Sequence, residues 1–157
     1  MLIDKNEIRM RKANENDVDT YFRWANDEEV RRNSFNTTQI NYDNHVAWFK
    51  KRLNNAACQF YFFEYNYKPL GQVRIEDSSN EVIIGISLDE AFRGLGLAPL
   101  LLEKASADYL NKHNGQKITA YIKKDNLASY KAFLKAGFTF VEDVLISDSP
   151  SYKLIRK

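Results

Sequence analysis

The segment from residue 88 to residue 98 reads Leu88-Asp89-Glu90-Ala91-Phe92-Arg93-Gly94-Leu95-Gly96-Leu97-Ala98. A strand-like apolar run ends where it begins, and a helical apolar pattern starts where it ends. Its glycines let the backbone approach a ligand closely, and the free N–H groups of a helix start attract an anion such as a diphosphate. A glycine turn without a ligand fits the spacing equally well. The missing Gly-Lys-Ser/Thr excludes a P-loop, and the missing third glycine excludes a full dinucleotide fingerprint.

A second motif follows in the C-terminal part of the chain and reads Asn126-Leu127-Ala128-Ser129-Tyr130-Lys131-Ala132-Phe133-Leu134-Lys135-Ala136-Gly137-Phe138. Together the two segments resemble the GNAT superfamily of N-acetyltransferases. Residues 93–98 are similar to the family's Arg/Gln-x-x-Gly-x-Gly/Ala loop, which binds the pyrophosphate of acetyl-CoA. Residues 126–138 are similar to its asparagine followed by a helix that ends in Gly-Phe. The resemblance spans nearly the whole chain and implies an acetyl-CoA-dependent N-acetyltransferase that needs no metal.

The surrounding pattern predicts a mixed α/β (α+β) fold in one domain, residues 1–157. Strands are expected at residues 8–12, 59–65, 71–76, 82–88, 117–122, 138–144 and 152–156. Helices are expected after Asn16-Asp17, after Asn41, and over 97–110 and 126–136, where Gly137 supplies the left-handed C-cap residue. Residues 31–39 have the pattern of a loop. The resemblance implies the GNAT arrangement, a mostly antiparallel twisted sheet that splays at a central parallel pair, with helices on both faces.

Composition narrows the functional class. One cysteine and two distant histidines among 157 residues argue against a disulfide framework or a classical metal site. A net charge of +2 does not suggest a nucleic-acid partner. The chain lacks an apolar run long enough for a membrane span, and its N-terminal residues lack a signal-peptide h-region. The expected setting is therefore cytoplasmic, without a membrane partner.

The resemblance also implies which residues hold acetyl-CoA. In the family, the strand before the loop is bulged and parts from the next parallel strand, and the pantetheine arm lies in the gap. By position, the backbone of Ile86 and Leu88 faces the cofactor, and the Leu88 N–H is the donor to the thioester oxygen. A plain helix cap is the alternative role for Asn126. The other implied cofactor-binding residues are Arg93, Gly94, Leu95, Gly96, Leu97, Ala98, Asn126, Ser129 and Phe133.

The chain departs from the family where protons are transferred. Many members carry a tyrosine acid seven residues after the asparagine, where this chain has Phe133. Some carry a glutamate base five residues before it, where this chain has Tyr121. Tyr130, one helical turn before Phe133, is the candidate acid, with packing as its alternative. Glu76, at the end of the strand that borders the acceptor, is the candidate base, with an exposed carboxylate as its alternative.

The N-terminal third is expected to choose the acceptor. Its Trp-x-Asn-Asp-x-x-Val-Arg stretch, followed by His-x-x-Trp-Phe, is similar to members that acetylate the 4-amino group of nucleotide-linked deoxy sugars in pseudaminic-acid-type routes to bacterial surface glycans. Aromatic faces stack on a sugar or base, and arginines bind a diphosphate. For the tryptophans, Trp24 and Trp48, the alternative role is core packing. For His45, the alternatives are a structural role or that of a catalytic base. The implied substrate-binding residues are Trp24, Asn26, Arg31, Asn33, His45 and Arg74.

Two rival functions stay open. A ribosomal-protein N-terminal acetyltransferase, whose N-terminal region is distantly similar, would need an open peptide groove without sugar-phosphate contacts. An inactive acetyl-CoA-binding module is favoured by Phe133 and Tyr121. A homodimer is an open alternative to a monomer.

Overall fold

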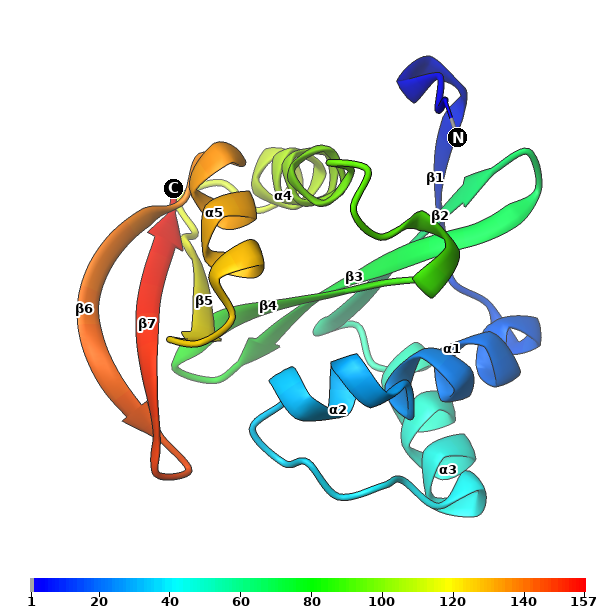
Figure 1. The fold of residues 1–157 in the computed structure, drawn as a ribbon, viewed down its shortest axis with the longest axis horizontal. Coiled ribbons are helices and arrows are strands. Elements are labelled where there is room, and N and C mark those ends of the chain that lie inside the picture. Colours follow the sequence, from blue (N-terminus) through cyan, green and yellow to red (C-terminus); the bar gives the residue numbers. More distant parts are fainter. Residues whose placement is uncertain (1) are drawn as a thin grey trace.

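A computed structural model describes residues 2–157, which form a seven-stranded sheet with helices on both faces (Figure 1). Along the sheet the strands lie in the order β1-β2-β3-β4-β5-β7-β6. Within residues 2–157, no helix is both long and apolar enough to cross a membrane. In chain order the elements are η1 (Lys5–Glu7), β1 (Ile8–Lys12), η2 (Glu15–Asp17), α1 (Val18–Ala25), α2 (Glu28–Asn33), α3 (Tyr42–Leu53), β2 (Cys58–Tyr65), β3 (Lys68–Ser78), β4 (Glu81–Leu88), η3 (Glu90–Phe92), α4 (Ala98–Lys112), β5 (Ile118–Lys123), α5 (Leu127–Lys135), β6 (Thr139–Ile146) and β7 (Ser149–Arg156).

The sheet is antiparallel except at β4 and β5, its one parallel pair. These strands pair only where Val82 meets Ile118 and Ile83 meets Thr119, and then they part. The mixed fold with a splayed central pair is therefore confirmed. The expected bulge in β4 is wrong, because its register with β3 runs without a shift along the whole of β4. The gap comes from divergence of β5, which crosses to pair with β7 instead.

Two hydrophobic clusters lie on opposite faces of the sheet. Helices α4 and α5 cover one face, and α1, α2 and α3 lie on the other (Figure 1). The larger cluster joins the first face to α4, whose predicted inward residues Leu101, Leu102, Ala105 and Tyr109 are all buried. The smaller cluster is aromatic and joins α1 and α3 to β2 through Tyr21, Trp24, Phe49, Cys58, Phe60 and Phe62.

The predicted elements agree with the observed ones within a few residues, except in one place. The expected loop over residues 31–39 is wrong at its start, because α2 covers Glu28–Asn33. Its N-cap is Asp27, whose carboxylate accepts from the backbone N–H groups of Glu29 and Val30. Acidic residues in its first turn and arginines in its last complement the helix dipole. Gly137 ends α5 with φ +93°, as predicted.

Two glycines on adjacent strands allow a test of this packing. A Cβ on Gly71 in β3 would lie 2.6 Å from the Ser87 carbonyl oxygen, whereas a Cβ on Gly85 in β4 would meet nothing within 4 Å. Gly71→Ala is therefore expected to lower the free energy of unfolding by about 1–3 kcal/mol through overpacking. Gly85→Ala serves as the matched control in urea denaturation and should lose less than half as much. Equal losses would contradict this account of the β3–β4 contact.

Candidate active site

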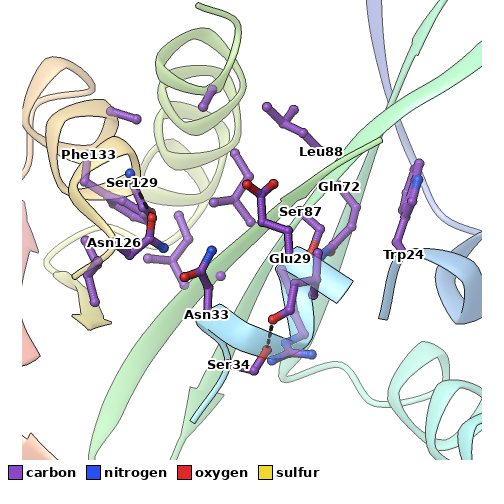
Figure 2. Close-up of a pocket in the computed structure, with 18 of the residues that line it drawn as sticks. Trp24, Glu29, Asn33, Ser34, Gln72, Ser87, Leu88, Asn126, Ser129 and Phe133 are labelled. Atoms are coloured by element: carbon purple, nitrogen blue, oxygen red, sulfur yellow. Dashed lines mark hydrogen bonds between the residues drawn. The ribbon is translucent and has the colours of Figure 1, made fainter. Parts of the chain in front are cut away.

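A cleft of about 1050 Å³ opens along β4 and β5 and reaches both helical layers. Figure 2 shows Glu29 and Asn33 pointing into it from α2, with Asn126 and Ser129 on one side and Ser87 on another. Most residues implied for the cofactor and the acceptor border this single space. Of the sequence-predicted site residues, those that line it are Trp24, Arg31, Asn33, His45, Arg74, Ile86, Leu88, Arg93, Gly94, Gly96, Leu97, Ala98, Asn126, Ser129 and Phe133.

The backbone of β4 presents free polar groups to the gap. In an antiparallel ladder, hydrogen-bonded and non-hydrogen-bonded pairs alternate. The Asp89 N–H donates to the Leu70 carbonyl at 2.8 Å, so the next pair, Leu88 with Gly71, is a non-hydrogen-bonded one. The N–H of Leu88, and by the same alternation that of Ile86, therefore points away from β3 toward the gap. That orientation is the one a cofactor-facing strand needs.

The glycine loop leads from this strand into α4. Gly94 and Gly96 both adopt left-handed backbone angles, with φ +74° and +71°, and both are exposed. Helix α4 starts at Ala98 with Pro99 in its first turn and without a side-chain cap. Pro99 has no N–H, and the Leu100 N–H donates to the Leu97 carbonyl at 3.1 Å, so the Ala98 N–H is the group that the first turn leaves for an anion. Leu95 does not line the cleft and packs against the larger core instead.

The side chain of Arg93 contacts protein carboxylates. Its guanidinium lies 2.7 Å from Asp27 Oδ1 and 2.9 Å from Glu29 Oε2, and it also donates to the Leu88 carbonyl at 3.2 Å. With two carboxylates beside it, this guanidinium does not supply a free charge for a pyrophosphate. Its contacts instead tie the glycine loop to the start of α2. The pKa of the Asp27 carboxyl is lowered: burial alone would raise it, and the Arg93 and backbone hydrogen bonds outweigh burial.

Asp89 makes a second contact between the segment after β4 and helix α1. Its role was not predicted from the sequence. Its buried carboxylate accepts from Arg23 and from the Trp24 indole N–H, both at 2.9 Å, and caps η3 through the Ala91 N–H. Trp24 is only 3% exposed and stacks on Phe62. Trp24 is thus a core residue whose edge borders the cleft.

Two residues expected at the acceptor instead hold the chain around α2. The Asn26 amide exchanges two 2.8 Å hydrogen bonds with the backbone of Ile40 and does not line the cleft. The Arg31 guanidinium donates to the carbonyls of Asn36 and Thr38 and to the Ser34 hydroxyl. Both side chains therefore fix the segment after α2, and only the Nε of Arg31 lacks a partner.

His45 is buried at the back of the cleft. Its Nε2 lies 3.1 Å from the Val18 carbonyl, which requires a proton on that nitrogen because a carbonyl only accepts. Its ring stacks on Phe49 and lies close to Trp48. Burial lowers the pKa of His45, so the neutral ring dominates at neutral pH. These contacts give His45 a structural role and do not leave it as an exposed base.

The two side chains expected to move protons do not line the cleft. The Glu76 carboxylate is ion-paired with Arg52. Tyr130 packs edge-on against Tyr152, with ring centroids 4.3 Å apart, on another side of α5. Glu76 follows Gln72 and Arg74 at alternate positions of β3, and its charge is neutralised by Arg52 of helix α3.

A different pair of proton-carrying groups borders the cleft. The Tyr121 hydroxyl of β5 donates a hydrogen bond to the Glu81 carboxylate at the start of β4. Both residues line the cleft. Burial and this hydrogen bond raise the pKa of Tyr121 to about 12, which keeps the hydroxyl protonated at neutral pH. Tyr121 occupies the position at which some family members carry a glutamate base. In this chain the carboxylate comes instead from Glu81 of the neighbouring strand β4.

The start of α5 closes the cofactor end. The Asn126 side chain caps the helix by accepting from the Ser129 N–H at 3.3 Å, and both residues line the cleft. Phe133 is buried edge-on against Phe138, which makes it a packing residue at the cleft wall. Lys131 and Lys135 also border the space and add positive charge near this end. Among residues 2–157, no cluster of potential metal ligands occurs.

These features fit acetyl-CoA as a guest. An open strand edge matches a pantetheine arm, and glycines before an uncapped helix start match a pyrophosphate. The family model described as "Acetyltransferase (GNAT) domain" matches residues 7–139. The chain belongs to this family, and it is an acetyl-CoA-dependent N-acetyltransferase with acetyl-CoA as cosubstrate.

Solved structures share the fold at low sequence identity. The spermidine N-acetyltransferase of Vibrio cholerae, in complex with CoA and spermine, is 14% identical with a TM-score of 0.86, over 97% of this chain and 96% of that one. The aminoglycoside acetyltransferase AAC(6')-Ib, with ribostamycin and coenzyme A, is 18% identical with a TM-score of 0.78, over 96% and 93%. An uncharacterised Bacillus halodurans protein is 17% identical with a TM-score of 0.81, over 98% and 87%. No curated protein sequence matches significantly.

The glycine loop can be tested with two positions of equal backbone strain. Gly96 and Gly115 both have positive φ, +71° and +83°, and a Cβ at either would meet nothing within 4 Å. Only Gly96 lines the cleft. Gly96→Val is expected to weaken acetyl-CoA binding in calorimetry by about tenfold or more, because the side chain blocks close approach of the pyrophosphate. Gly115→Val is the strain control and should bind normally. Unchanged affinity in Gly96→Val would refute the cofactor placement.

Proposed function

We propose that this enzyme transfers the acetyl group to the primary amine of a nucleotide-linked deoxy amino sugar, at its 4-amino group. The observation that carries the proposal is the charge of the cleft. Arg93 is paired with two carboxylates, and Lys131 and Lys135 lie near the start of α5, where the cofactor is expected. The rest of the lining holds three positive side chains, Arg31, Arg74 and Lys123, against two carboxylates, Glu29 and Glu81. This excess suits an acceptor that carries phosphate.

The two carboxylates already have protein partners. Glu29 lies 2.9 Å from Arg93, and Glu81 accepts from Tyr121 with Lys153 3.9 Å away. Spermine and ribostamycin, the molecules bound in two of the structural neighbours, carry several amines each. A polycation in this cleft would meet more positive than unpaired negative charge. The residue pattern of α1 to α3 and the charge of the cleft therefore favour the same anionic acceptor.

The backbone supports direct transfer within a ternary complex. A free amine attacks the thioester carbon, a C–N bond forms, and the C–S bond breaks. Negative charge that develops on the carbonyl oxygen is stabilised by the Leu88 N–H, which points into the gap. No covalent acyl-enzyme is needed. Cys58 is buried in the aromatic cluster, and burial raises the pKa of its thiol, so it is a poor nucleophile.

Tyr121 and Glu81 provide the path for the amine's proton. As the amine attacks, the Tyr121 oxygen accepts its proton while the hydroxyl proton passes to the Glu81 carboxylate along their hydrogen bond. The departing thiolate takes a proton from water. This relay replaces Glu76 and Tyr130, since neither borders the cleft.

A comparison of acceptors tests the proposed reaction. Coenzyme A release is measured with a nucleotide-linked 4-amino deoxy sugar, a ribosomal N-terminal peptide and spermidine. Release with the sugar at a kcat/KM well above the other two is expected. Preference for the peptide would establish the N-terminal acetyltransferase instead. Acetyl-CoA binding without release in any arm would establish the inactive binding module.

Two tyrosine variants distinguish the proposed Tyr121–Glu81 proton relay from a general acid at Tyr130. Tyr121→Phe is expected to lower kcat by about 10²-fold, the range typical of a lost general base, with little change in acetyl-CoA affinity. Tyr130→Phe removes the same hydroxyl outside the cleft and should leave kcat within twofold. The reverse result in steady-state kinetics would return the proton chemistry to Tyr130.

A further inference from the structure

We propose that Arg74 is an anion anchor, which binds a phosphate group of the acceptor beside the point of acetyl transfer. The proposal rests on the amine-acetylating function above and deepens it by assigning the acceptor's charged group to one side chain. Arg74 lies in β3, directly opposite Gly85 of β4. Because Gly85 has no side chain, the space above this part of the sheet is open, and Arg74 borders it.

Arg74 is distinguished by what it lacks. Within residues 2–157, no carboxylate lies within 4 Å of its guanidinium, and the structure gives it no hydrogen-bond acceptor. The neighbouring arginines are occupied: Arg52 pairs with Glu76, and Arg93 pairs with Asp27 and Glu29. The Arg74 guanidinium is half-buried and borders the open cleft, so an anion that enters the cleft can pair with it.

The indole of Trp48 fixes the guanidinium from behind. Its ring centroid lies 5.3 Å from the Arg74 guanidinium carbon and 5.9 Å from that of Arg52. A cation held on an aromatic face keeps the edge of its N–H fork free for a bidentate anion. Arg52 also repels Arg74, and burial is the main cause that lowers the pKa of Arg74. A bound anion would offset both the repulsion from Arg52 and the cost of burying the charge of Arg74.

Two neutral polar atoms around Arg74 also lack partners. The Gln72 Oε1 lies on the same face of β3, two residues away, and the Tyr21 hydroxyl belongs to α1. Both border the cleft, and Tyr21 is only 4% exposed. Burial raises the pKa of Tyr21, and the charge of Arg74 acts against that rise. A phosphate ester that carries hydroxyl groups would satisfy the tyrosine donor and the amide acceptor together with the guanidinium.

The binding test uses inorganic pyrophosphate and uridine diphosphate as probes, with coenzyme A saturating the cofactor end. Calorimetry is expected to show binding to the wild-type enzyme and a loss of about 10- to 100-fold in Arg74→Gln, the range for hydrogen bonds to a charged group. Arg9→Gln removes an arginine of β1 that does not line the cleft and should bind as wild type does. No binding to wild type, or equal binding to Arg74→Gln, would overturn the proposal.

Steady-state kinetics then distinguish a role of Arg74 in acceptor binding from a role in the chemical step. With the nucleotide-linked amino sugar, Arg74→Gln should raise KM by about the same factor, with kcat and acetyl-CoA affinity nearly unchanged. Spermidine and a carboxylate-bearing amino sugar are the parallel acceptors. A KM effect confined to the carboxylate arm would assign Arg74 to carboxylates and reject phosphate. Pyrophosphate binding lost in Arg74→Gln, with no acetyl transfer to any amine, would leave the anchor standing and remove the proposed function.

Discussion

The site depends on the early parting of β4 from β5. Two residue pairs join these parallel strands, and beyond Ile83 and Thr119 the ladder stops. A sheet interior cannot leave backbone N–H groups without partners at low cost, so an unpaired stretch at its centre marks a place for a ligand. The gap exposes the β4 backbone to one helical layer and the side chains of β3 to β5 to the other. The cleft at this gap is therefore lined by residues of both helical layers.

Charged contacts hold the two helical layers in register across this gap. Asp89 binds Arg23 and Trp24 of α1, and Arg93 binds Asp27 and Glu29 at the start of α2. Each contact joins the segment that follows β4 to helix α1 or to the start of helix α2. Partly buried, multiply hydrogen-bonded pairs of this kind are geometrically specific even where their net contribution to stability is small.

Local signals allowed the fold and the cofactor loop to be predicted from the sequence. Glycines at positive φ, the Asn41 and Asn126 caps and the Gly137 C-cap are fixed by backbone chemistry within a few residues. Helix α2 was missed although Asp27 offered a cap, because a six-residue helix has little apolar periodicity. The β4 bulge was expected by analogy, and the structure opens the gap through β5 instead.

The candidate site was less predictable because its side chains are paired over long sequence distances. Strand alternation correctly placed Glu76 on the polar face of β3, yet nothing local indicated that Arg52 would neutralise it. The partnership of Tyr121 with Glu81 likewise spans 40 residues and two strands. Residue type gives the chemistry a side chain can perform, and only tertiary pairing decides whether that chemistry is free to act.

We propose that the same distinction lets one fold select among acceptors of different charge. An N-acetyltransferase cleft must deliver a neutral amine to the thioester whatever the rest of the acceptor carries. In this chain, both cleft carboxylates have partners, while Arg74 has none among residues 2–157. Selectivity for charge is therefore set by the side chains that stay unpaired rather than by the total number of charges. In the proposal above, the unpaired guanidinium of Arg74, opposite Gly85, gives the transfer point a preference for an anionic acceptor that the net charge of the chain, only +2, does not reveal.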